Sequence, residues 1–156
     1  MDIENFWAVT VSADHAARGR QAGFVQVCHG KSAPLRRMYP GDGVVIYSPR
    51  DAFKGGLPLM AFTAIGRIKA QDPYVFDMVG GFTPWRRGVD WQPDAVTVPI
   101  HPLLDQLELT KAKQSWGMVF RFGLTQLIRA DFALIARIMV PQDPAISFLA
   151  PSPHMI

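Results

Sequence analysis

The sequence predicts an α+β fold in which a small curved β-sheet, or open barrel, carries short helices at its periphery. Two observations support this fold class. Apolar residues make up 49% of the 156-residue chain and charged residues only 19%, so one domain can bury a substantial core. Short β-branched and aromatic segments also follow one another along the chain, separated mostly by hairpin and turn signals. We expect six or seven strands, two or three helices and no internal repeat.

In the first half of the chain, strand segments alternate with turn residues. Strands are predicted over residues 6–11, 24–28, 44–47 and 59–69, and turns over residues 39–42 and 54–56. A short helix is predicted over residues 15–21, capped by Ser12 or Asp14 and ended by Gly23. Pro34 is expected to start a helical turn over residues 35–38. In the long strand, alternation places Ala61, Thr63 and Ile65 on one face and Phe62, Ala64 and Gly66 on the other.

The second half continues this pattern and ends in a helix and a tail. Extended segments are predicted over residues 74–79, 82–91, 96–100 and 120–127, with a helical segment over 103–107 and a turn or short helix end at 115–117. Residues 130–140 place Phe132, Ile135, Ala136 and Met139 at helical spacing. Residues 141–156 hold four prolines and no periodicity, so we expect a loosely docked tail after a single domain spanning residues 1–140.

Charge and cysteine content indicate which cellular compartment and which partners are compatible with the chain. The formal net charge of +3 permits a nucleic-acid partner without requiring one. A single cysteine excludes an internal disulfide and suits a reducing cytoplasm. The N-terminus carries acids where a signal peptide needs basic residues, and no uncharged apolar run reaches ~18 residues. We therefore expect a cytoplasmic protein with no membrane partner.

Motifs for metal binding, cofactor binding and catalysis are weak. The four histidines show no paired ligand spacing, and neither Gly55-Gly56 nor Gly80-Gly81 has the spacing of a phosphate loop, so no metal or cofactor is expected. Cys28-His29 suggests a nucleophile, but neighbouring strand residues point to opposite faces, so His29 is poorly placed to activate the thiol. A buried strand cysteine is the simpler interpretation.

Aromatic and arginine side chains form the most informative pattern. The aromatic residues concerned are Trp7, Tyr47, Phe62, Phe82, Trp85, Trp91 and Trp116, and the arginine pairs are Arg36-Arg37 and Arg86-Arg87. Flat rings and guanidinium planes stack on nucleic-acid bases, and each stacked base contributes about 1–3 kcal/mol. Most rings in a small barrel are core residues, however, and alternation allows at most one of Arg86 and Arg87 to line a given pocket.

Taken together, several segments resemble one protein family. They are FWAVTVSADH, GFVQVCHGKSAPLRRMYPGDGVVIYSP, LMAFTAIGRI, GGFTPWRRGVDW, PLLDQL and SWGMVFRFGL, and they cover about residues 5–138. The chain resembles the EVE domain, specifically a small stand-alone UPF0310-type branch of the PUA-like superfamily, which is related to YTH domains. The resemblance implies a PUA-like pseudo-barrel, in which a bent mixed sheet is flanked by short helices.

The resemblance also implies a function. YTH domains hold a methylated adenine in an aromatic cage, and the likeness implies a non-enzymatic reader of a modified base in DNA or RNA, single-stranded or flipped out. It further implies a partner nuclease or ATPase. By position, the implied pocket walls are Trp7, Ser12, Gln26, Cys28, His29, Lys31, Tyr47, Ser48, Phe62 and Thr63, with Trp85, Arg86, Trp116, Phe120 and Arg121 as the opposite rim. Other EVE branches carry Lys-Ser-Glu-Pro after the first strand, and only Ser12 of that segment is present here.

The leading hypothesis is that a base enters one cleft lined by Trp7, Tyr47, Phe62, Trp85 and Trp116, with Ser12, Gln26 and Ser48 bonding its edge. A second hypothesis is a sensor module for a small molecule or free nucleotide, whose binding would depend little on salt. A third is an enzyme that uses Cys28 with an unidentified base.

Overall fold

The computed structural model describes residues 5–78 and 80–149, which form a curled mixed sheet with helices on both faces. The strands are β1 (Phe6–Thr10), β2 (Phe24–Val25), β3 (Gly43–Arg50), β4 (Pro58–Ile68), β5 (Tyr74–Val75), β6 (Trp85–Trp91), β7 (Val98–Pro99) and β8 (Leu124–Leu127). Their order is β2-β6-β4-β3-β1-β8, with β5 beside β6 and β7 beside β4. The sheet is mixed because β1 runs parallel to β3 and antiparallel to β8. The predicted α+β pseudo-barrel is confirmed.

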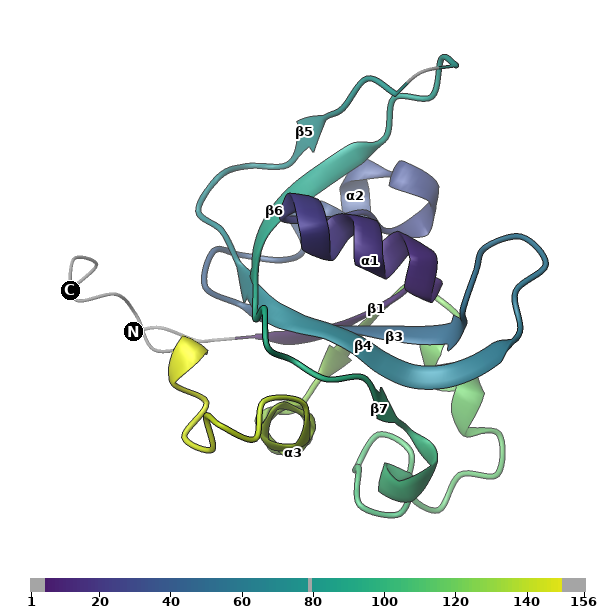
Figure 1. The fold of residues 1–156 in the computed structure, drawn as a ribbon, viewed down its shortest axis with the longest axis vertical. Helices are drawn as coiled ribbons and strands as arrows, with labels where there is room; N and C mark the ends of the chain where they lie inside the picture. The colour runs from purple at the N-terminus through teal and green to yellow at the C-terminus, as the bar shows by residue number, and fades with distance from the viewer. Residues whose placement is uncertain (1–4, 79, 150–156) are drawn as a thin grey trace.

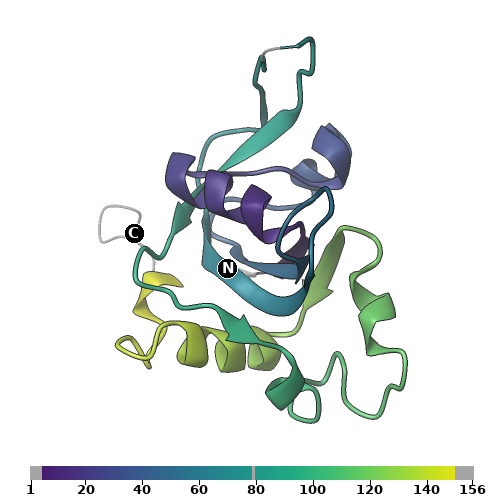
Figure 2. The same ribbon diagram turned by 45° about the vertical axis from the view of Figure 1, so that its right-hand side comes forward.

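Helices cover both faces of this sheet and create two cores. The α-helices are α1 (Ala13–Ala22), α2 (Ser32–Arg36) and α3 (Arg129–Met139), and the 3₁₀ turns are η1 (Cys28–Gly30), η2 (His101–Leu103), η3 (Trp116–Phe120) and η4 (Ser147–Leu149). Figure 1 shows α1 and α2 on one side of the central strands and α3 on the other, and the turned view in Figure 2 agrees. The α3 core includes Phe6, Tyr47, Phe62, Phe132 and Leu149, and the α1 core includes Trp7, Val9, Ile46, Ala64 and Val89.

The predicted alternation along β4 is wrong because the strand contains a bulge. Ile46 of β3 pairs with Ala64 and the next residue, Tyr47, pairs with Phe62, so Thr63 is an extra residue on β4. The bulge shifts the pattern of faces by one position. As a result Phe62 and Ile65, which we expected on opposite faces, both belong to the α3 core, while Ala64 belongs to the α1 core.

The predicted strand over residues 24–28 is also wrong at its end. Pairing stops at Val25, and Cys28, His29 and Gly30 have φ values of 50°, 60° and 83°. These left-handed conformations form a tight turn, which a strand cannot contain. Gly30 is required there, since a Cβ at this position would lie 2.5 Å from the Cβ of Pro84.

Other element boundaries differ from the sequence-based prediction. Pro34 lies inside α2 instead of starting a helical turn, and Phe120 ends η3 instead of opening the strand that became β8. In the segments at 74–79 and 82–91, the strands themselves are shorter than predicted, as β5 and β6. Backbone hydrogen bonds from Phe76 to Pro84 and from Met78 to Phe82 continue the pairing toward the turn, and Val79 lies outside the described residues. The helical segment predicted at 103–107 begins earlier, as η2, and continues as turns.

The predicted C-terminal helix is confirmed as α3, and it fixes the long segment that precedes η3. Buried Asp131 accepts hydrogen bonds from the backbone N–H groups of Glu108 and Leu109, at 2.8 and 3.0 Å. Beyond α3, residues 141–149 turn back and bury Leu149 in the α3 core. The rest of the tail, with His154, lies outside the described residues. No helix in the described part of the chain has the length and apolar character needed to cross a membrane.

Candidate functional site

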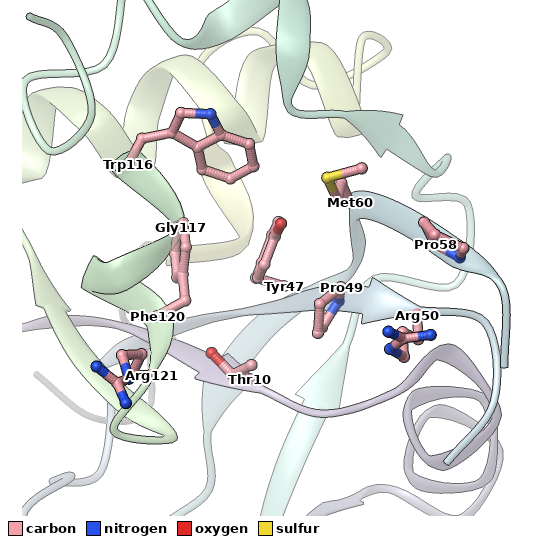
Figure 3. A pocket seen from close by; sticks show the side chains of 10 residues that line it. All are labelled: Thr10, Tyr47, Pro49, Arg50, Pro58, Met60, Trp116, Gly117, Phe120 and Arg121. Atoms are coloured by element: carbon pink, nitrogen blue, oxygen red, sulfur yellow. The ribbon is translucent and has the colours of Figure 1, made fainter. Parts of the chain in front are cut away.

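An open pocket lies where the parallel strands β1 and β3 end and β4 begins. Its volume is about 570 Å³, and it is lined by Thr10, Tyr47, Pro49, Arg50, Pro58, Met60, Trp116, Gly117, Phe120 and Arg121. Figure 3 shows these side chains around the pocket, with the η3 residues on one side and the β3–β4 residues on the other. The sheet therefore supplies a rigid floor, while the segment that ends in η3 supplies a wall.

Three aromatic rings form the apolar part of the pocket. Tyr47 stacks on Phe120 with 4.1 Å between ring centroids and 20° between ring planes. Trp116 stands edge-on to Tyr47 at 6.4 Å and is itself held by the ring of His101 at 5.6 Å. Tyr47 and Phe120 are both 97% buried, whereas Trp116 is only half-buried. Trp116 is therefore the ring of this cluster with most surface left to receive a planar ligand.

Two hydroxyl groups contribute polar atoms to the pocket. Burial raises the pKa of Tyr47 to about 12, so its phenol stays neutral and able to donate a hydrogen bond at physiological pH. Figure 3 shows this hydroxyl pointing between Trp116 and Met60. Among the described residues, the buried hydroxyl of Thr10 makes no hydrogen bond. The Tyr47 hydroxyl is therefore placed to bond the edge of a ligand, and the Thr10 hydroxyl is a buried group beneath the pocket surface that lacks a partner in the described part of the chain.

Two arginines give the pocket its charge. The Arg50 guanidinium donates to the carbonyl of Gly56 at 2.7 Å, and that of Arg121 to the sulfur of Met118 at 3.5 Å. The lining contains no aspartate or glutamate. In the described part of the chain neither Arg50 nor Arg121 forms an ion pair with a carboxylate. The pocket therefore favours an anionic ligand.

The turn containing Cys28 contacts the residues that follow η3, the element that forms one wall of the pocket. The Cys28 thiol donates to the carbonyl of Phe122 at 3.3 Å, and a Cβ on Gly123 would lie 2.7 Å from that sulfur. The N–H of Thr10 donates to the carbonyl of Gly123 at 2.9 Å. The turn after η3 is thus fixed between β1 and η1. His29 is exposed, and its ring lies edge-on to Phe53 at 6.3 Å.

Trp7 does not reach the pocket, although the sequence-based hypothesis placed it there. Its side chain belongs to the α1 core on the opposite face of the sheet. Its indole N–H donates at 2.9 Å to the buried carboxylate of Asp42, which also accepts the backbone N–H groups of Asn5 and Tyr39. Trp7 therefore holds the turn before β3 in place.

Trp85 and Arg86 also lie away from the pocket. Trp85 packs against the α1 core, with the Arg36 guanidinium 5.4 Å from its ring centroid. Arg86 lies between the rings of Phe24 and Phe76, each 3.8 Å away. Its Nε donates to Gln26 at 2.7 Å, and burial lowers the pKa of its guanidinium. The Arg86 guanidinium is therefore already engaged by two aromatic rings of the protein itself.

The remaining residues of the implied site are buried or distant. Ser48 and Thr63 share a buried hydrogen bond at 2.8 Å. The buried ring of Phe62 packs edge-on against Tyr47, with 5.8 Å between the ring centroids. Ser12 donates to the Asp14 carboxylate, and Lys31 is exposed beyond η1. The structure thus brings together Tyr47, Trp116, Phe120 and Arg121, and it does not form a single cleft from all five proposed rings.

Several lining residues were missed in the sequence. They are Thr10, Pro49, Arg50, Pro58, Met60 and Gly117. Arg50 had a usable signal, because it is a lone cation directly after the strand that carries Tyr47. The others are apolar or small, and only the fold shows that they line the pocket. Across residues 5–78 and 80–149, no three His, Cys, Asp or Glu side chains gather as a metal site.

Comparison with known proteins gives consistent likenesses. The EVE domain family matches residues 5–138. A UPF0310 protein of Mesorhizobium japonicum is 50% identical over 136 residues, covering 86% of this chain and 91% of that protein. The UPF0310 protein YdcG of Bacillus subtilis is 38% identical over 135 residues, covering 86% and 92%. A crystal structure of a Pseudomonas putida protein has a TM-score of 0.52 at 16% identity, covering 86% of this chain and 99% of that one, and shows likeness of fold alone.

Proposed function

This chain belongs to the EVE domain family, and we propose that it is a non-enzymatic module that binds a nucleic-acid strand and reads a modified base in the Tyr47–Trp116–Phe120 pocket. One observation carries the proposal: a half-buried indole and two arginines without carboxylate partners line the same pocket. Any nucleic-acid base can stack on an aromatic ring, and arginine binds phosphate. This combination therefore suits a nucleotide better than an uncharged metabolite.

The lining also suggests how a modified base is preferred. Pro49, Pro58 and Met60 form an apolar side of the pocket opposite η3. A methyl group added to a base and buried against these side chains contributes about 0.8 kcal/mol, or about fourfold in affinity. The neutral hydroxyl of Tyr47 supplies a hydrogen bond that orients the ring edge.

The test is a tryptophan-fluorescence titration with short single strands. One strand is unmodified, and a matched series carries methylated or hydroxymethylated bases, each at low and moderate salt. We expect stronger quenching by one modified strand, and weaker affinity for all strands as salt rises.

Two other results would argue against base reading. Equal quenching by every strand, abolished by salt, would leave only a basic surface. Quenching by free nucleotides but not by strands, with little salt dependence, would instead favour the second hypothesis, a small-ligand sensor.

A further inference from the structure

The two pocket arginines lie toward the two ends of one edge of the pocket. In Figure 3, Arg121 lies beside Phe120 at the end of η3, Arg50 lies at the end of β3, and Thr10 and Pro49 come between them. Arg50 follows Pro49 directly and is held by Gly56 of the β3–β4 loop, whereas Arg121 is held by Met118 of η3. The two cations are thus positioned by different elements.

This arrangement restricts the shape of an anionic ligand. A ring lying against Trp116 faces an edge of the pocket that carries two separate cations, with Thr10 and Pro49 between them. The lining supplies no acid that would oppose a second negative charge. A free 5′-mononucleotide carries its phosphates on one side of the sugar. An internal nucleotide of a strand carries one phosphate on each side, which matches two separated arginines.

Resting on the proposed function, we infer that the pocket takes an internal nucleotide of a strand, with Arg50 binding the phosphate on one side of the base and Arg121 the phosphate on the other. Neither cation forms an ion pair among the described residues, so no internal salt bridge has to break when phosphate binds. Base recognition and strand recognition are then separate functions of one pocket.

The first test is the salt dependence of binding to a random-sequence single-stranded DNA hexamer, measured by fluorescence anisotropy. Each phosphate contact on a single strand changes the slope of log K against log salt by about 0.7. Arg50→Gln and Arg121→Gln should each reduce the magnitude of the slope by about 0.7, and the double variant by about 1.4. Arg50→Lys keeps the charge and should keep the slope. Arg36→Gln, an exposed arginine over Trp85, is the matched control and should change nothing.

The second test identifies which arginine binds which phosphate. The probes are adenosine, its 5′-monophosphate, its 3′-monophosphate and its 3′,5′-bisphosphate, each also with an N6-methyl group. Each phosphate should raise affinity by about fivefold at low salt. Arg50→Gln should lose the gain from one phosphate, and Arg121→Gln the gain from the other.

The outcomes separate this inference from the function on which it rests. If strands bind in a way that needs Trp116, but neither glutamine variant changes the slope, the inference fails and the proposed function survives. The inference also fails, and the proposed function again survives, if both variants lose the response to one and the same phosphate, or if all four adenosine probes bind equally. If no strand shows binding that depends on Trp116, both fail.

Discussion

Replacing Phe132 with alanine should lower the free energy of unfolding by about 3–5 kcal/mol. Phe132 is fully buried, and its ring lies 4.9 Å from that of Phe6. The ring also covers Gly43, where an added Cβ would lie only 2.8 Å from it. Alanine would leave a cavity between α3 and the strands β1 and β3, because the backbones around it cannot close in. Denaturant unfolding measures the change.

A matched control separates burial from aromatic character. Phe122 is 79% exposed, so Phe122→Ala should change the free energy of unfolding by no more than about 0.5 kcal/mol. Since a domain of this size is stable by only about 5–15 kcal/mol, the Phe132 variant should lose a large share of its stability. A loss below about 1 kcal/mol for Phe132→Ala would contradict the assignment of this ring to the α3 core.

Replacing Trp116 with alanine should weaken binding of a single strand by about 5- to 150-fold, with the fold retained. This range follows from the contribution of one base stacked on one aromatic side chain, about 1–3 kcal/mol. Trp116 is half-buried at the pocket wall, so its loss removes ligand-accessible ring surface and little of the core. Anisotropy of a labelled strand measures the affinity without depending on tryptophan emission, and circular dichroism checks the fold.

Trp85→Ala is the matched control for this prediction. Trp85 is also half-buried, but it lies with the α1 core beneath Arg36. Its replacement should leave strand affinity within about twofold of the original protein. A larger loss from Trp85→Ala than from Trp116→Ala would move the binding site to the other face of the sheet.

Local patterns in the sequence predicted much of the fold. The 3.6-residue spacing of Phe132, Ile135, Ala136 and Met139 predicted α3, and β-branched segments predicted β1, β3 and β4. These elements are formed by residues whose burial follows a simple period. The family resemblance, confirmed by the EVE domain match over residues 5–138, added the barrel topology, which depends on pairing between distant strands.

The errors arose where distant contacts decide local conformation. The left-handed turn at Cys28 and His29 is adopted by residues that rarely take it, and its neighbours are Pro84 and Gly123, far along the chain. The bulge at Thr63 likewise gives no clear local signal, and its hydroxyl bonds Ser48 on the next strand. Neither feature follows from propensity alone.

The site was the part least accessible to sequence reasoning. Whether Trp7 and Tyr47 share a face depends on the register of β1 against β3, in which Trp7 pairs with Val44 and Thr10 pairs with Tyr47. That register sends Trp7 to the α1 core and Tyr47 to the α3 core. Without it, aromatic residues spread along a chain cannot be divided between two faces.

Base reading at Trp116 is tested most directly by following the indole N–H resonances of the four tryptophans by NMR during titration with the modified and plain strands. The N–H groups of Trp7 and Trp91 are bonded inside the protein, to Asp42 and to Gly19, and should hardly shift. We predict that the Trp116 resonance shifts most, and at lower concentrations of the preferred modified strand than of the plain one. A shift confined to Trp85, or no shift of Trp116 with any strand that binds, would contradict base reading in this pocket.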